Sequence, residues 1–327
     1  MKRILLLVLL ASATQLIRAQ IAAPTLELEA VPHFLKTPTD GNLIQPTGVA
    51  VNSKGHVFAF NKGNRQLMEF DEQGNYLRSL GHGIFKDPHG LRIDRYDNIW
   101  TTDLVSHLVI KMNPEGQVQM VLGENGTSGL LNETRNMVLF FKPADIAIAR
   151  NGDIYVADGY GNHRVVHMDK AGNLIKTWGK KGKEDGNFDN PHNIVLDHRD
   201  RVYVADRNNA RIQVFDKNGK FLSKWDNVGK PWGLAISPER HLYMTDGDSE
   251  KILKLDLAGN ILGSFAGGSG TNTGQFRAAH GIAVGTGEEL YVTEVLNWRV
   301  QKFEQIAKKG PWQRLLTNNR SNRRHES

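Results

Sequence analysis

A short motif recurs six times along this chain, and it constrains the fold more than any other feature of the sequence. In each copy, one position that we call the slot follows a proline or an alanine and precedes a short apolar run, as in Pro88-His89-Gly90-Leu91. The six slot residues are Thr47, His89, Ala144, His192, Trp232 and His280. They are separated by 42, 55, 48, 40 and 48 residues. Spacings of this size are typical of the blades of a β-propeller.

Each copy also carries the pattern of four short strands. In the third copy, the apolar runs 146–149, 154–158, 165–168 and 174–178 are separated by polar turns that contain Asn-Gly or Gly-Asn. Such dipeptides favour tight hairpins between antiparallel strands. The sequence therefore predicts an all-β, six-bladed β-propeller with four-stranded blades over residues 20–304.

Two segments lie outside the repeat. Residues 25–31 alternate like a half-buried strand, and we expect them to complete one blade and close the ring. Residues 123–138 form an insertion rich in Gly, Asn and Thr between the second and third copies. We expect this insertion to form a loop over one mouth of the propeller.

The N-terminal end resembles a secretory signal. Met1-Lys2-Arg3 precedes the apolar run 4–10 and then small residues, which predicts a signal peptide over 1–19 with cleavage after Ala13 or Ala19. An apolar strand or helix of the mature fold is the alternative. Because the chain has no cysteine, no disulfide supports the fold, and a large core must stabilise it. We expect a secreted or periplasmic protein with no membrane attachment after cleavage.

The net charge of +6 comes from the two ends of the chain. Residues 1–19 contain three basic residues and residues 304–327 carry a net +4, so the region between them is close to neutral. A neutral body and an export signal argue against a nucleic-acid partner. The basic segment 305–327 is expected to be a disordered, solvated tail, and binding to a partner is the alternative.

Histidine occupies every second slot, at His89, His192 and His280. In a six-bladed ring, alternate blades lie about 120° apart, and the slot directly precedes the innermost strand. These three imidazoles are therefore expected to converge on the axis and to leave a fourth position open, as at a catalytic zinc site. The alternative is a water-filled channel mouth in which the histidines bind no metal.

The second predicted strand of each copy ends in a carboxylate or amide side chain. These residues are Asn61, Asp103, Asp158, Asp206, Asp246 and Glu294. With the Asn and Arg residues that follow in several copies, this pattern resembles NHL-type repeats over residues 45–304. In such repeats the acidic residue and the arginine mainly tie the loops of one blade together, so we interpret these carboxylates as structural.

Longer motifs resemble the catalytic domain of peptidyl-α-hydroxyglycine α-amidating lyases. The resemblance rests on the three histidine slots and on the segments 158–164 and 204–213. It implies an axial zinc on the three histidines, a catalytic tyrosine at Tyr160 and an active-site arginine at Arg207. Nearby positive charge is expected to lower the pKa of Tyr160 so that it can act as a base. A plain loop aromatic and an ordinary contact between blades are the alternatives for these two residues.

The chain departs from that family at several positions. Lys62 stands where the family has a second catalytic arginine, unless Arg65 takes over that role. The resemblance implies a calcium ion on the carbonyls of Val49 and Leu91, but Gly281 replaces the expected aspartate, which makes calcium doubtful. The positions of the family's disulfide cysteines are Gly161 and Val214, and we expect no mono-oxygenase domain before the propeller.

Two classes of function compete on this sequence. The first is an exported zinc-dependent lyase that cleaves a peptidyl-α-hydroxyglycine or similar carbinolamide, with a small-molecule or peptide substrate at the channel mouth. The second is a non-catalytic NHL propeller that binds a protein or a glycan. A calcium-dependent lactonase propeller fits less well, because such a site needs inward carboxylates where this chain has histidines.

Overall fold

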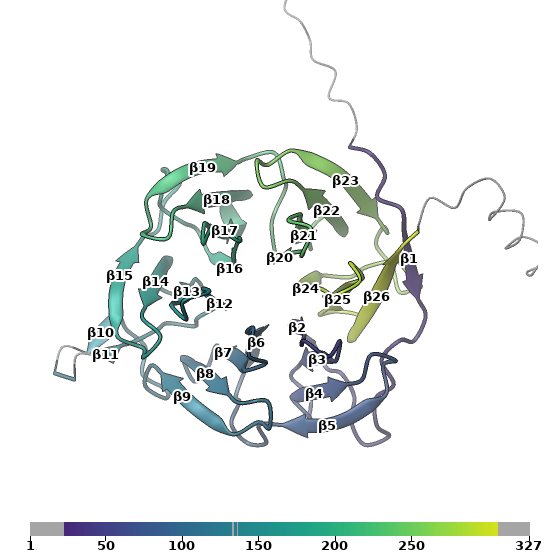
Figure 1. Ribbon diagram of the computed structural model, residues 1–327, viewed down its shortest axis with the longest axis horizontal. Helices are drawn as coiled ribbons and strands as arrows, with labels where there is room; N and C mark the ends of the chain where they lie inside the picture. The colour runs from purple at the N-terminus through teal and green to yellow at the C-terminus, as the bar shows by residue number, and fades with distance from the viewer. Residues whose placement is uncertain (1–22, 133, 136, 307–327) are drawn as a thin grey trace, which may run out of the picture.

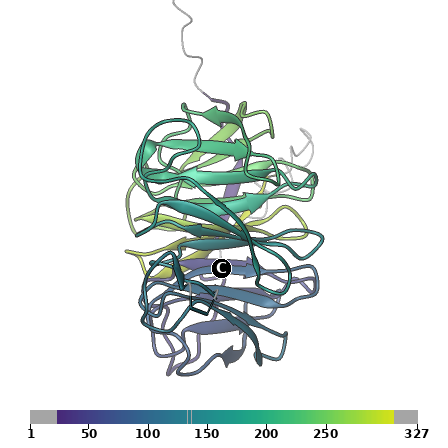
Figure 2. The ribbon, with the colours of Figure 1, turned by 90° about the vertical axis from the view of Figure 1, so that its left-hand side faces the viewer.

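The computed structural model describes residues 23–132, 134–135 and 137–306. Six four-stranded antiparallel sheets are arranged as a ring around a central axis (Figure 1). Seen from the side, the ring is a disc with turns on both faces (Figure 2). The structure confirms the expected six-bladed β-propeller.

Each blade runs from an inner strand to an outer strand in chain order, except for the last. Blade one contains β2 (Gly48–Val51), β3 (Val57–Phe60), β4 (Leu67–Phe70) and β5 (Tyr76–Leu80). Blade two contains β6 (Pro88–Ile93), β7 (Ile99–Asp103), β8 (Leu108–Met112) and β9 (Val118–Leu122). Blade three contains β12 (Asp145–Ile148), β13 (Ile154–Asp158), β14 (Arg164–Met168) and β15 (Leu174–Trp178).

The second half of the ring repeats this arrangement. Blade four contains β16 (Pro191–Leu196), β17 (Val202–Asp206), the 3-10 turn η1 (Arg207–Asn209), β18 (Arg211–Phe215) and β19 (Phe221–Trp225). Blade five contains β20 (Gly233–Ile236), β21 (Leu242–Asp246), β22 (Lys251–Leu255) and β23 (Ile261–Ala266). Blade six contains β24 (Ala279–Val284), β25 (Leu290–Glu294), β26 (Arg299–Gln305) and, from the other end of the chain, β1 (Leu28–Val31).

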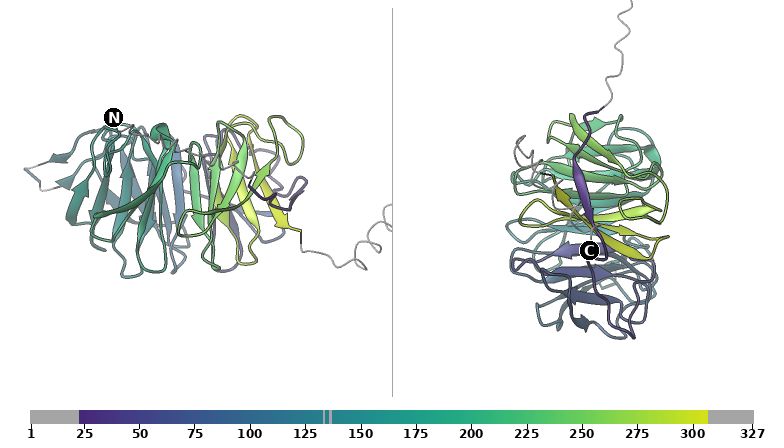
Figure 3. Two further views of the ribbon diagram at one scale, coloured as in Figure 1. Left: turned by 90° about the horizontal axis from the view of Figure 1, so that it is seen from above. Right: turned by 90° about the vertical axis from the view of Figure 1, so that its right-hand side faces the viewer.

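The ring is closed by pairing the two ends of the propeller. β1 pairs antiparallel with β26, with Leu28 opposite Gln305 and Val31 opposite Lys302 (Figure 3, right). This confirms that residues 25–31 contain a closing strand. Because β1 lies on the outer edge of blade six, the chain begins and ends the ring in the same sheet.

The hydrophobic core lies between neighbouring blades. Each of its six clusters combines side chains from two adjacent blades, as where Tyr203 of blade four packs with Leu234 and Leu253 of blade five. The second residue of the second strand is a fully buried tyrosine in four blades, namely Tyr155, Tyr203, Tyr243 and Tyr291. The second strand of each blade is buried along its whole length, so side chains on both of its faces pack against neighbouring blades.

The acidic residues that end the second strands hold loops together. The carboxylate of Asp206 accepts hydrogen bonds from the amide of Asp189 (2.7 Å), from Asn209 (2.9 Å) and from Arg211 (2.7 Å). Glu294 makes the equivalent contacts in blade six with Asn297 and Arg299. These contacts support the structural interpretation of the repeated carboxylates.

We expected the insertion at 123–138 to lie over a mouth of the channel, and this prediction is wrong. It forms a small hairpin, β10 (Leu131–Asn132) with β11 (Met137–Val138), at the outer edge of the ring (Figure 1). Asn162 and Arg164 hold it there through the carbonyl oxygens of Gly129, Leu130 and Leu139. These bonds fix the insertion beside the outer part of blade three, and the mouth stays uncovered by it.

The expected signal peptide over 1–19 lies outside the described residues, as does the tail from 307 onward. Among the described residues, no helix is long and apolar enough to cross a membrane.

Candidate metal centre

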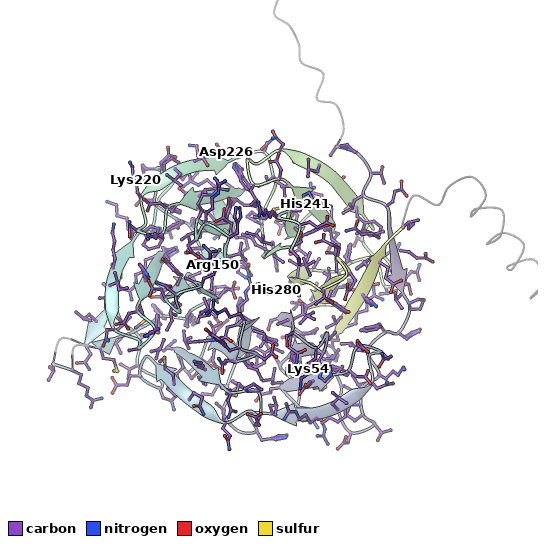
Figure 4. All side chains as sticks on the ribbon, in the orientation of Figure 1. Lys54, Arg150, Lys220, Asp226, His241 and His280 are labelled. Atoms are coloured by element: carbon purple, nitrogen blue, oxygen red, sulfur yellow. The ribbon has the colours of Figure 1, made fainter. Side chains whose placement is uncertain are left out.

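The three histidines of the alternate slots meet at the centre of the ring. His89, His192 and His280 lie near the starts of β6, β16 and β24 and are 4%, 1% and 6% exposed. Each offers a ring nitrogen that lies within 4.8 Å of the other two. Figure 4 shows His280 at the centre of the propeller. The fold thus brings together side chains separated by 103 and 88 residues in sequence.

The second ring nitrogen of each histidine is held by the next blade. Nδ1 of His89 donates to the carbonyl oxygen of Ala144 (2.7 Å), Nδ1 of His192 to that of Trp232 (2.6 Å), and Nδ1 of His280 to that of Thr47 (2.8 Å). These acceptors are the slot residues of the odd blades. Because a carbonyl oxygen can only accept, Nδ1 carries the proton and the Nε2 lone pair points to the axis.

Glycine follows two of the three histidines, His89 and His280. A Cβ on Gly90 would lie 2.7 Å from the carbonyl oxygen of Ala144, and a Cβ on Gly281 would lie 2.6 Å from that of Thr47. Glycine at these two positions therefore lets the acceptor carbonyl of the next blade come close enough to orient the ring.

The site keeps the three imidazoles neutral. Burial lowers the pKa of His280 to about 4, with smaller contributions from the charges of Arg207 and Lys62. Burial likewise holds the pKa values of His89 and His192 well below the ordinary range, and repulsion among the three rings adds to the effect. Neutral imidazoles are the form that binds a metal.

Tyr160 places its hydroxyl at the same point. In the loop between β13 and β14, its Oη lies 3.0 Å from Nε2 of His89 and 2.9 Å from Nε2 of His192. A phenol has one proton, so it can satisfy one of these two acceptors. Three nitrogen lone pairs therefore share one hydrogen-bond donor, which leaves lone pairs available to a cation. Nitrogen ligands of this kind suit zinc.

The lowered pKa that we expect for Tyr160 in a metal-bearing pocket does not arise from the protein groups alone. Burial raises the pKa of this phenol, and the positive charge of Arg207 opposes the rise without overcoming it. Removal from water destabilises the phenolate more than the one neighbouring guanidinium stabilises it.

Arg207 lies over the mouth, at the start of η1. Its guanidinium carbon is 5.5 Å from the ring centre of Tyr160 and 4.8 Å from that of Trp232. The indole of Trp232 also packs against His192 and His280, and its Nε1 donates to Asp248 (3.0 Å). Among the described residues, no carboxylate lies within ion-pair distance of Arg207. Two aromatic rings thus hold the guanidinium in place.

Lys62 and Arg65 come from the same loop of blade one but point in different directions. Lys62 forms an ion pair with Asp87 (2.7 Å), and its charge contributes to the lowered pKa of His89 and His280. Arg65 is bound to Asp40 and donates to the hydroxyl of Tyr76 (3.1 Å) on the outer strand β5. The structure places Lys62 near the three histidines and Arg65 toward the outside of the blade.

A partly buried ion pair lies next to the histidines in the channel. Arg92 of β6 binds Asp145 through two nitrogens and also donates to Asn193 (2.7 Å). Its guanidinium lines a cavity of about 20 Å³ together with Val49, Leu91 and Gly281. These are the residues that the family resemblance links to calcium. With a fixed cation in the cavity, its carboxylate already paired and Gly281 offering no side chain, the cavity does not fit calcium.

The comparisons with known proteins agree with this geometry. The NHL repeat family model matches residues 140–168 and 188–215. A probable peptidyl-alpha-hydroxyglycine alpha-amidating lyase of Caenorhabditis elegans, pgal-1, is 30% identical over 306 residues, covering 80% of this chain and 83% of that protein. The chain belongs to the peptidyl-α-hydroxyglycine α-amidating lyase family.

Other relatives differ more in length. NHL repeat-containing protein 3 of Homo sapiens is 35% identical over 64% of this chain and 62% of its own. Peptidyl-alpha-hydroxyglycine alpha-amidating lyase 1 of Drosophila melanogaster is 31% identical over 79% of this chain, which spans 56% of the fly protein. A solved streptogramin B lyase structure aligns with a TM-score of 0.59 at 16% identity, over 85% of this chain and 97% of that one. This structural likeness shows the propeller fold alone.

Two residues at the centre of this lyase-family chain, Trp232 and Arg92, were not predicted from the sequence. Trp232 was recognised as a slot residue but not as a wall of the site, although it is the one aromatic residue among the odd slots. Arg92 is the one charged residue at its position of the inner strands. Its equivalents in the other blades are Ala50, Ala147, Val195, Ala235 and Ala283.

Proposed function

We propose that this chain is a zinc-dependent lyase that cleaves a peptidyl-α-hydroxyglycine, or a similar carbinolamide, into an amide and glyoxylate. One observation carries the proposal. The Nε2 atoms of His89, His192 and His280 converge on the point where Tyr160 presents its hydroxyl, in a chain of the amidating lyase family. The alternative, a non-catalytic NHL module, does not account for three neutral, oriented imidazoles at the axis.

His89, His192 and His280 would hold the zinc through Nε2. When bound, zinc would supply a Lewis acid for a substrate oxygen and would add to the effect of Arg207 on the pKa of Tyr160. Arg207, which has no ion-pair partner among the described residues, fits the carboxylate of the substrate. These groups surround the space in which a carbinolamide would react.

The proposed reaction needs one proton to move. Tyr160 in its phenolate form accepts the proton of the substrate hydroxyl at Oη. The carbon–nitrogen bond then breaks with its electron pair going to nitrogen, the carbon becomes the aldehyde of glyoxylate, and the proton passes from Tyr160 to the amide nitrogen. Atoms and charges balance without a further reactant.

The test compares Tyr160→Phe with Tyr96→Phe, a tyrosine that is 67% exposed on an inter-strand turn. With α-hydroxyhippurate as the probe, we expect Tyr160→Phe to lower kcat for glyoxylate release by about 10²–10⁴-fold. Zinc content, measured by elemental analysis, should stay the same, and Tyr96→Phe should leave both unchanged. Equal turnover by Tyr160→Phe and the unmodified protein would remove the tyrosine from the reaction. A purified protein without zinc or turnover would favour the binding module.

We further propose that the protein is exported to a secreted or periplasmic location. The support is the charged start and the short apolar run 4–10. N-terminal sequencing of the mature protein should begin after Ala13 or Ala19. An intact Met1 would contradict export through this segment.

A further inference from the structure

We propose a second divalent-metal site, formed by Glu239, His241 and Glu288, on the face of the propeller opposite the three axial histidines. Glu239 and His241 belong to the turn between β20 and β21, and Glu288 to the turn between β24 and β25. These turns follow the inner strands of blades five and six, whereas the slots precede them. In Figure 4, His241 lies away from the centre that His280 occupies. The proposal is independent of the lyase reaction.

The side chains of the three residues converge. One ligand atom from each residue lies within 4.8 Å of the other two. Nδ1 of His241 is 3.8 Å from Oε2 of Glu239, and this nitrogen is enclosed without a hydrogen-bond partner among the described residues. Ligand atoms around a bound metal at about 2.0–2.2 Å lie closer together than this. The side chain of Glu239 is 65% exposed and can make the small movement required.

Neighbouring groups already orient two of the ligands. The hydroxyl of Tyr243 donates to Oε2 of Glu288 (3.2 Å), and Gln305 donates to that hydroxyl (3.0 Å). The backbone amide of His241 donates to Oγ of Ser237 (3.3 Å) within the same turn. Contacts of this kind behind metal ligands fix their direction and raise affinity.

The set of donors selects a class of metal. One imidazole nitrogen and two carboxylates suit zinc, manganese, cobalt or nickel better than calcium or magnesium, which prefer oxygen ligands. Three protein ligands leave positions for water. Because the site joins the turns of two blades beside β26, a bound ion would link blade five to the blade that closes the ring.

The test counts zinc in the full chain after metal removal and dialysis against zinc alone. We expect about two equivalents in the unmodified protein and about one in His241→Ala, with glyoxylate release unchanged. Glu288→Gln should weaken the second equivalent by about 10–100-fold. Unchanged stoichiometry in His241→Ala would overturn the proposal, whatever the outcome at the axial site.

A matched control is available in blade four. His198 lies in the equivalent turn, and its Nδ1 is also enclosed without a partner among the described residues, but it belongs to none of the ligand clusters found there. His198→Ala should keep both equivalents. The triple variant His89→Ala, His192→Ala, His280→Ala should still bind one equivalent of zinc. Adding His241→Ala to this variant should remove that equivalent. If that triple variant misfolds, the single His241→Ala count decides the question by itself.

Discussion

The direction of each axial histidine is set by one backbone carbonyl. His89, His192 and His280 each donate Nδ1–H to the slot residue of the following blade. The alternation of the slots therefore has a physical basis, because even slots supply ligands and odd slots supply the acceptors that orient them. An odd slot needs no particular side chain for this role, which is why threonine, alanine and tryptophan all occur there.

Gly281→Ala should weaken metal binding without touching a ligand. A Cβ at this position would lie 2.6 Å from the carbonyl oxygen of Thr47, so the acceptor of His280 must move. We expect zinc affinity to fall by about 10–100-fold, measured by competition with a chelator. The matched control is Gly182→Ala in the loop before β16, where an added Cβ would meet the flexible side chain of Glu184 and no carbonyl oxygen. Equal loss in both variants would contradict a specific effect on the carbonyl.

The metal-free protein should lose stability in mild acid through His280. Its pKa is lowered to about 4 in the folded protein from 6.5, so the unfolded state binds the proton first as the pH falls. Above about pH 6.5, His280 does not lower the free energy of unfolding. As the pH falls from about 6.5 to about 4, this free energy declines by about 1.4 kcal/mol per pH unit. Urea unfolding at several pH values should show a shallower decline for His280→Gln. Identical slopes would mean that the ring is not kept neutral by burial.

At the scale of elements, the outer strand of blade six depends on long-range pairing. β1 and β26 are about as far apart in sequence as two strands of this propeller can be, yet they pair over Leu28–Val31. Leu28 is 7% exposed and packs in the cluster between blades five and six. The outer strands of other blades, such as β5, are local hairpin partners and carry more exposed side chains.

Leu28→Ala should destabilise the propeller by about 2–5 kcal/mol, because it removes buried apolar surface at the closure. Leu77→Ala on β5 is the matched control, since Leu77 is also on an outer strand but is 45% exposed. We expect its effect to stay within about 0.5 kcal/mol. Chemical denaturation of both variants measures the difference. A small effect of Leu28→Ala would show that β1 is not needed to hold the ring closed.

At the scale of the whole molecule, the axial centre connects blades that share no interface. His89, His192 and His280 belong to blades two, four and six, and each also holds the blade that follows it. The polar bonds of Arg92 reach Asp145, Asn193 and Leu234 of blades three, four and five. Contacts at the axis thus complement the apolar clusters between neighbouring blades.

Zinc should stabilise the folded ring, because the complete ligand set exists in the folded state. At a free zinc concentration of 100 Kd, we expect a gain of about 2.7 kcal/mol in the free energy of unfolding. Thermal unfolding with and without zinc measures the gain in a His241→Ala background, which removes the proposed second site. In that background, adding His192→Ala should abolish the gain. Full stabilisation in the double variant would show that zinc binds elsewhere.

The sequence by itself determined the number of blades, the four-strand pattern and the alternation of the histidines. These features are periodic, and each repeat records the same local requirements for turns and buried strands. Because ring closure places equivalent positions evenly around an axis, the convergence of His89, His192 and His280 followed from the repeat count. The closing strand at 25–31 was also visible, since its alternation stood outside any complete copy.

The tertiary structure decided what the repeat does not encode. Lys62 and Arg65 are three residues apart in one loop, and only their partners, Asp87 and Asp40, show which of them turns toward the axis. The insertion at 123–138 lies at the outer edge because of bonds to Asn162 and Arg164, which no periodicity predicts. The raised pKa of Tyr160 likewise depends on burial. Side-chain direction and desolvation arise from contacts between blades, and a pattern along the chain carries no information about them.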